Sequence, residues 1–176
     1  MRRPILFALA LAVFAGRAAA DDAAALRAAA DGFYGVYKTF HPSDGIPDEA
    51  GRARYRPFLS ARLDALLAQA GDADKRFAAA NKAAPPLVEG DLFTSLFEGA
   101  STVAVGACTA AGSAGSCTAS LSYAPPGGNP TRWTDTVYLV NTPEGWRVDD
   151  IGYGGSWDFG NKGRLSETLG QVIHFQ

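Results

Sequence analysis

The sequence has few of the residues that metal and redox centres need. Its 176 residues include two cysteines and two histidines, and His41 and His174 stand far apart along the chain. A structural zinc site closes with four ligands, so two thiolates without a nearby histidine leave it incomplete. Sequence patterns that bind phosphates, dinucleotides or metals are missing as well. The sequence therefore predicts no cofactor and no metal site.

Long apolar runs are also missing, apart from one near the start. The run from Ile5 to Phe14 follows two arginines and is succeeded by three alanines at 18–20. A membrane-spanning helix needs about 20 apolar residues, roughly twice the length of this run. A charged start, a short apolar stretch and a small-residue end are typical of a secretory signal peptide. We therefore predict a signal peptide over 1–20 and a single domain over 21–176, periplasmic or secreted, with no membrane anchor after cleavage.

Positive charge is scarce once the predicted signal peptide is removed. The chain has 16 basic and 18 acidic residues, and residues 1–20 take away three arginines and no acid, which leaves a net charge of −5. The densest basic cluster is four arginines between positions 52 and 62, with few aromatic neighbours. Proteins that bind nucleic acids present extended basic surfaces to the phosphates. The sequence therefore predicts no nucleic-acid partner.

A nucleophilic triad is not recognisable either. The segment GGSWD around Ser156 lacks the second glycine of a nucleophile elbow, and nothing places either histidine beside that serine. No catalytic residue is assigned on this basis, and a non-catalytic protein is the favoured interpretation.

The two cysteines that are present flank the short segment TAAGSAG. Exported proteins mature in oxidising compartments, so Cys108 and Cys117 are predicted to form a disulfide. Closing so short a loop stabilises the fold by about 2–3 kcal/mol, mainly because it restricts the unfolded chain.

The first part of the predicted domain has the pattern of helices. Between residues 22 and 40 the apolar positions recur at steps of three and four, which places them on one helix face. Gly32 and Gly35 each cost about 1 kcal/mol of helix stability, so we expect both to allow close approach of another backbone. A loop over 41–51, a helix over 56–71 and a short helix over 72–82 follow. The apolar face of the first helix comprises Leu26, Ala30, Phe33, Tyr37 and Phe40.

Four segments with apolar residues at alternate positions come after Gly99. They cover 101–108, 116–124, 131–142 and 145–153, and in the third of them Trp133, Val137 and Leu139 share one face. The links between the segments are short and rich in Gly and Pro, and such links join antiparallel neighbours. The two cysteines are expected at the facing ends of the first two strands. With a final helix over 162–173, the sequence predicts an α+β fold in which N-terminal helices pack on a four-stranded antiparallel sheet.

The first helix, with DGFYGVYKTF, and the last strand, with PEGWRVDDIGYGG, resemble the nuclear transport factor and ketosteroid isomerase superfamily, also called cystatin-like. The runs PLVEGDLFTSLFEGA and GWRVDDI resemble a family of small exported bacterial proteins of unknown function. The resemblance implies a curved sheet that wraps round the helices as a cone with a pocket at its wide end. The superfamily includes isomerases, dehydratases, cyclases and binding modules, so it says little about activity. Its members often pair through the outer face of the sheet, which makes a homodimer a candidate assembly.

The segment 85–100, PPLVEGDLFTSLFEGA, holds the first two candidate binding residues. In one interpretation Asp91 caps a helical turn, while four large apolar residues fill the space between helices and sheet. In the other, Asp91 and Glu98 are pocket carboxylates, and one of them has the raised pKa that suits a general base. The four apolar residues are Leu92, Phe93, Leu96 and Phe97.

Two further regions carry candidates. In a regular strand Asp150 shares the face of Trp146 and is a buried or pocket acid, whereas a bulge turns both Asp149 and Asp150 to water. The glycine-rich segment 152–163 is either a ligand or partner loop or a cap folded over the core. The complete set of candidate binding residues is Asp91, Glu98, Trp133, Asp150, Tyr153 and Trp157.

Three functions from different classes are consistent with these observations. The favoured one is an exported, non-catalytic binding domain in the bacterial cell envelope, whose partner is a small molecule or an envelope protein. The second is an immunity protein that blocks a periplasmic toxin. The third is an isomerase or cyclase that uses Asp91 or Asp150 as its general base, an activity that requires a deep apolar pocket around a desolvated acid.

Overall fold

The computed structural model describes residues 8–39 and 45–175, with side chains from Ala20 onward. The first seven residues of the predicted signal peptide, Phe40 and His41 lie outside this range. Within it, no helix is long and apolar enough to cross a membrane. In chain order the elements are α1 (Ala8–Thr39), α2 (Glu49–Tyr55), the 3-10 helix η1 (Arg56–Phe58), α3 (Ala61–Ala80), β1 (Thr102–Ala111), β2 (Ala114–Tyr123), β3 (Thr131–Thr142), β4 (Gly145–Gly152) and α4 (Leu165–Ile173).

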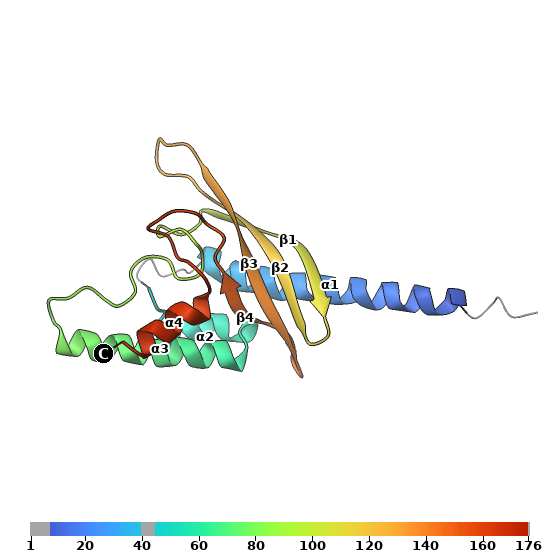
Figure 1. Ribbon diagram of the computed structural model, residues 1–176, viewed down its shortest axis with the longest axis horizontal. Coiled ribbons are helices and arrows are strands. Elements are labelled where there is room, and N and C mark those ends of the chain that lie inside the picture. The colour runs from blue at the N-terminus through green and yellow to red at the C-terminus, as the bar shows by residue number, and fades with distance from the viewer. Residues whose placement is uncertain (1–7, 40–44, 176) are drawn as a thin grey trace, which may run out of the picture.

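The four strands form one antiparallel sheet in the order β1-β2-β3-β4, so the predicted α+β fold with a four-stranded meander and a short C-terminal helix is confirmed. Helix α1 crosses the sheet, and α3 and α4 lie side by side next to β4 (Figure 1). The sheet is open, with β1 and β4 at its edges. The predicted strand bounds agree with the observed ones to within three residues, because alternation and turn chemistry are both local signals.

Helix α1 and the inner face of the sheet form most of the core. The predicted stripe of Leu26, Ala30, Phe33 and Tyr37 is buried, and Trp133, Val137 and Leu139 are buried on β3 as expected. A Cβ on Gly32 would lie 2.2 Å from the ring of Phe58, so this glycine does allow a close approach, although to a side chain. The same expectation for Gly35 is wrong, because a Cβ there would meet nothing within 4 Å.

The helices after α1 differ from the prediction. Asp48 caps α2 by accepting the N–H of Gly51 at 2.8 Å, so a helix begins inside the predicted 41–51 loop. Ser60 caps α3 by accepting the N–H of Leu63 at 3.0 Å, which separates α3 from η1. Gly71 does not end the helix, and α3 runs on to Ala80 through the region predicted as a separate helix.

The edge of β4 is covered by the segment between η1 and α3. Leu59 forms a parallel bridge with Val148, and the N–H of Ser60 donates to the carbonyl of Val148 at 2.8 Å. This contact takes up an edge hydrogen-bonding group and fixes where α3 begins.

The predicted disulfide is confirmed. Cys108 and Cys117 face each other directly across β1 and β2, with Cα atoms 4.1 Å apart. They do not lie at the ends of these strands as expected, because β1 continues to Ala111 and the chain turns only at Gly112 and Ser113.

Candidate functional site

Asp91 is a buried residue of the loop that precedes β1. Its Oδ1 accepts the N–H of Phe93 at 2.8 Å, and its Oδ2 accepts the hydroxyl of Tyr37 at 2.7 Å. The residues that follow Asp91 form a series of bends rather than a helix, so the predicted helix cap is wrong in that respect. Asp91 instead holds a non-helical turn against α1.

The apolar residues of the same loop point in two directions. Leu92, Phe93 and Leu96 are buried between the helices and the sheet, as predicted. Phe97 is 45% exposed, so its predicted place in the core is wrong. Glu98 is also exposed.

Asp135 on β3 is the most connected carboxylate in this region, and sequence reasoning did not select it. It is 0% exposed and accepts the N–H of Ser95 at 3.0 Å, the hydroxyl of Ser95, the indole N–H of Trp133 at 3.1 Å and the N–H of Gly154 at 2.9 Å. Its position supplied a usable signal: it shares strand parity with Trp133 and Val137, so period-two alternation puts it on the buried face.

Asp135 joins two loops that we call the two-loop cap, residues 88–100 and 153–164. Asn161 donates its side-chain amide to the carbonyls of Asp91 and Thr94, both at 2.7 Å, and its backbone N–H to the carbonyl of Ser95 at 2.9 Å. The hydroxyl of Tyr153 donates to the carbonyl of Leu92 at 2.7 Å. The glycine-rich segment is therefore held in one conformation by the first loop.

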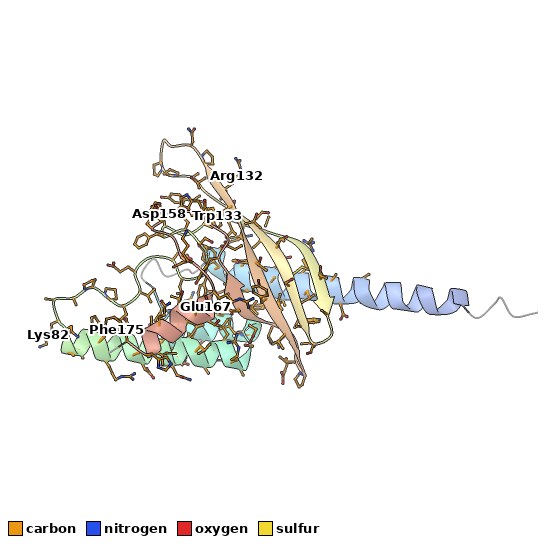
Figure 2. All side chains as sticks on the ribbon, viewed as in Figure 1. Lys82, Arg132, Trp133, Asp158, Glu167 and Phe175 are labelled. Atoms are coloured by element: carbon orange, nitrogen blue, oxygen red, sulfur yellow. A yellow bond between two sulfur atoms is a disulfide. The ribbon has the colours of Figure 1, made fainter. Side chains whose placement is uncertain are left out.

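Two tryptophans extend the two-loop cap onto the sheet. Trp133 is buried, Trp157 is half-buried, and their rings meet edge to face with centroids 5.3 Å apart. Figure 2 shows Trp133, Arg132 and Asp158 at the same end of the molecule. Of the six candidate residues, Asp91, Trp133, Tyr153 and Trp157 thus come together there.

Asp150 lies at a bulge in β4. Tyr138 pairs with Asp150 and Leu139 with Val148, so Asp149 is the extra residue and the predicted bulge is present. The expectation that both carboxylates turn to water is wrong. Asp150 is buried and accepts the N–H and hydroxyl of Ser166, at 3.0 and 2.6 Å, at the start of α4.

Asp149 is engaged at the start of a different helix. It accepts the hydroxyl of Ser60 at 2.6 Å and forms an ion pair with Arg62 at 2.8 Å. Partial burial raises the pKa of the Asp149 carboxyl, but the hydrogen bonds from Arg62 and Ser60 outweigh burial and leave the pKa below its usual range.

Four tyrosines surround the buried acids. Burial, followed by the nearby charge of Asp91, raises the pKa of Tyr37, Tyr55 and Tyr153. Burial also raises the pKa of Tyr34, with Asp135 and then Asp91 adding to the effect. These phenols therefore stay neutral. The hydroxyls of Tyr37 and Tyr153 donate hydrogen bonds to Asp91 and to the carbonyl of Leu92. Among the residues that the structure describes, the buried hydroxyl of Tyr34 has no hydrogen-bond partner.

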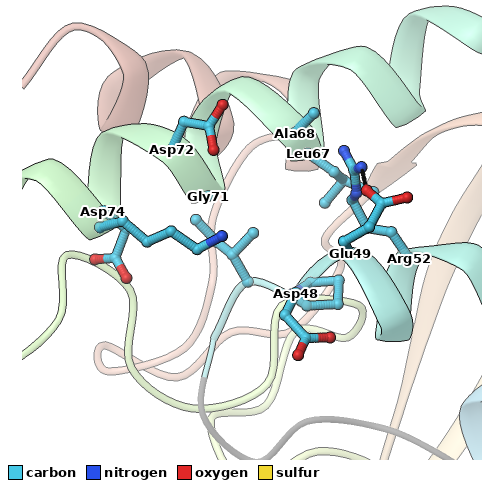
Figure 3. Close-up of a pocket in the computed structure, with 11 residues that line it drawn as sticks. Asp48, Glu49, Arg52, Leu67, Ala68, Gly71, Asp72 and Asp74 are labelled. Atoms are coloured by element: carbon cyan, nitrogen blue, oxygen red, sulfur yellow. Dashed lines mark hydrogen bonds and ion pairs between the residues drawn. The ribbon is translucent and has the colours of Figure 1, made fainter.

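Three hollows on the described surface lie elsewhere. One of about 230 Å³ separates α2 from α3, and the charged groups that line it are largely engaged: Glu49 pairs with Arg52, Asp48 caps α2, and Asp74 accepts the N–H of Leu87 (Figure 3). Others of about 560 and 570 Å³ lie beside β1 and beside the β3–β4 turn, and none of these three is lined by a candidate residue. Within the described ranges, no three His, Cys, Asp or Glu residues cluster in a way that could hold a metal ion.

What this arrangement can do chemically follows from its hydrogen bonds. Asp91, Asp135 and Asp150 are buried, and each accepts at least two donors from the protein, so these acids hold loops and helix ends. A general base needs a lone pair that can reach a substrate proton. The geometry accordingly gives the isomerase interpretation no support.

Comparison with known protein families, curated proteins and solved structures found no match to this chain. The resemblance to the nuclear transport factor and ketosteroid isomerase superfamily therefore stays a prediction.

Proposed function

We propose that this protein is an exported, non-catalytic binding domain that recognises another protein through its two-loop cap. The periplasm or the cell exterior is its proposed location, which the disulfide and the predicted signal peptide both support. The observation that carries the proposal is that different residues of the cap have different roles. Its buried acids and amides brace the loops, while Phe97 and Phe159 stay 45% and 65% exposed.

Exposed aromatic side chains on braced loops suit a protein partner for two reasons. Aromatic residues provide much of the binding energy at protein interfaces. Loops that are already ordered lose less conformational entropy on binding. A small-molecule ligand is less well supported, because Leu92, Phe93 and Leu96 fill the space beneath the cap.

The test compares two exposed phenylalanines in capture from an envelope extract. Phe159→Ser removes the more exposed aromatic of the cap. Phe175→Ser is the matched control. Phe175 is similarly exposed, at 58%, but it lies outside the cap and packs edge to face on Phe77 of α3. We expect the control to retain the partner, and Phe159→Ser to weaken binding by about tenfold or more in calorimetry with that partner. Equal capture by both variants would contradict the proposal.

A further inference from the structure

The disulfide joins one accessible sulfur to one buried sulfur. Cys117 is 1% exposed and belongs to the core. Cys108 is half-buried and lines the hollow of about 560 Å³ between α1 and β1. Thiol–disulfide exchange depends on which sulfur an incoming thiolate can reach. Here that sulfur is the one of Cys108.

The entrance to this hollow is formed largely by small side chains. Ala23, Ala24 and Ala28 come from α1 and Ala107 from β1. Because none of them extends beyond a methyl group, a loop that carries a thiol has room to approach Cys108. Because β1 is an edge strand, a second protein can reach the hollow beside it. A disulfide between two central strands would be covered by their neighbours.

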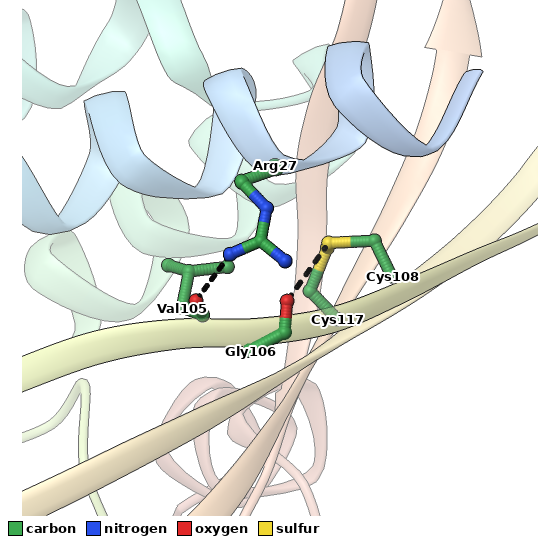
Figure 4. Close-up of a disulfide and its surroundings, with 5 residues drawn as sticks. All are labelled: Arg27, Val105, Gly106, Cys108 and Cys117. Carbon is green, nitrogen blue, oxygen red and sulfur yellow. Dashed lines mark hydrogen bonds between the residues drawn. A yellow bond between two sulfur atoms is a disulfide. The ribbon is translucent and has the colours of Figure 1, made fainter. Parts of the chain in front are cut away.

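Two charged residues, Arg27 and Asp31, line the hollow. The guanidinium of Arg27 donates to the carbonyl of Val105 at 2.6 Å, and this bond holds it beside the disulfide (Figure 4). A cation near a sulfur stabilises the thiolate form. Asp31 lies one turn further along α1 and acts in the opposite sense.

The sheet can accommodate the reduced form at this point. The register of β1 shifts between Val105 and Cys108, so the ladder is already interrupted there by a bulge. Pairing with β2 continues on both sides of the bulge, at 102–105 and at 108–111. The carbonyl oxygen of Gly106 lies 3.8 Å from the Cys108 sulfur and would accept its S–H after reduction. Loss of the disulfide therefore leaves the rest of the hairpin paired.

We propose that Cys108–Cys117 is a redox-active site that exchanges with a dithiol oxidoreductase in the exported compartment. A thiolate of the oxidoreductase attacks Cys108 Sγ, forms a mixed disulfide and expels the Cys117 sulfur, which takes up a proton. The second thiolate of the oxidoreductase then attacks the oxidoreductase sulfur of the mixed disulfide and expels Cys108 as a thiolate, which Arg27 stabilises until it takes up a proton. The protein gains two electrons and two protons, and the oxidoreductase becomes a disulfide.

The first test uses the full chain and a thioredoxin-type protein whose second cysteine is replaced by serine, so that the mixed disulfide is trapped. Peptide mass spectrometry then locates the adduct. We expect it on Cys108. An adduct on Cys117, or a disulfide that is reduced only as fast as the whole protein unfolds, overturns the proposal.

The second test measures the role of Arg27. Arg27→Gln is expected to slow the release of Cys108 from its mixed disulfide with dithiothreitol on the order of threefold to tenfold, because the departing Cys108 thiolate loses its cation. Lys38→Gln removes one positive charge from the same helix at an exposed position away from the hollow, and is expected to change the rate less than about twofold. Equal rates in the two variants refute the role of Arg27. If either variant unfolds, the position of the adduct on the unsubstituted protein decides by itself whether the proposal holds.

Discussion

The position of Asp91 depends most directly on the hydrogen bond that it accepts from the hydroxyl of Tyr37. Removal of this hydroxyl tests whether Asp91 has a structural role. In Tyr37→Phe, the Asp91 carboxylate loses a donor at 2.7 Å and the N–H of Ala100 loses its acceptor at 2.8 Å. A hydrogen bond to a charged group contributes about 1.5–3 kcal/mol and a neutral one about 1 kcal/mol. We therefore expect Tyr37→Phe to lower the free energy of unfolding by about 2.5–4 kcal/mol.

Tyr34→Phe is the matched control for this prediction. Tyr34 and Tyr37 lie on α1, both are almost fully buried, and their rings meet edge to face with centroids 5.9 Å apart. The hydroxyl of Tyr34 has no partner, so its removal deletes a buried polar group without breaking a bond. We expect a change between zero and a stabilisation of about 1–2 kcal/mol.

Urea unfolding followed by circular dichroism measures both variants. The midpoint should fall in Tyr37→Phe and hold or rise in Tyr34→Phe, with the dependence on urea unchanged. If Tyr34→Phe destabilises the protein as much as Tyr37→Phe, the loss arises from ring packing and the argument from hydrogen bonds is refuted. If Tyr37→Phe is neutral, Asp91 does not hold the loop through this bond.

Three further perturbations concern the buried tyrosines, the glycines and Asp150. Burial raises the pKa of four tyrosines above the ordinary value of 10.0, so the unfolded state loses these protons first; they are Tyr34, Tyr37, Tyr55 and Tyr153. The free energy of unfolding should therefore fall above pH 10 by about 1.4 kcal/mol per pH unit for each tyrosine. Urea titrations at alkaline pH that show no such decline would contradict this prediction. Gly154→Ala should destabilise the cap strongly, since its Cβ would lie 2.0 Å from the carbonyl oxygen of Thr134, whereas Gly35→Ala, with nothing within 4 Å, should raise the thermal midpoint through about 0.5–1 kcal/mol of helix propensity. Asp150→Asn should cost about 2 kcal/mol by weakening the charged hydrogen bonds at the start of α4, and an unchanged urea midpoint would show that they contribute nothing.

The sheet could be predicted from the sequence, whereas the boundaries of the helices could not. Alternating residues and Gly/Pro turns are local signals, and they located all four strands. The break between η1 and α3 depends on Ser60, whose hydroxyl caps α3 and whose N–H pairs with Val148 on β4. That second contact is long-range, so helical periodicity alone joined the two segments. Gly71 is a stop signal by composition, but inside α3 it is only a weak helix residue.

The candidate site was predicted only in part, because some of its contacts are also long-range. Asp91 was selected as a possible pocket carboxylate, and Tyr153 and Trp157 as aromatics of a possible ligand or partner loop, and the structure brings them together. Asp135 was not selected, although strand parity marks it as buried. Several of the bonds that give these residues their roles are long-range: Ser95 and Asp135 are 40 residues apart, and Asn161 and Asp91 are 70 residues apart. No local pattern encodes such pairs.

The adjacent acids Asp149 and Asp150 show how one backbone irregularity converts an apparent site into a structural joint. In a regular strand their side chains would face opposite sides of β4, and one would enter the core without a partner. The bulge at Asp149 changes that geometry and directs each carboxylate to the start of a different helix, Asp149 to Ser60 before α3 and Asp150 to Ser166 in α4. Helix N-termini attract negative charge because their N–H groups are unpaired. Both acids therefore fix two helices to one edge strand, and this role accounts for the pair without any catalytic step.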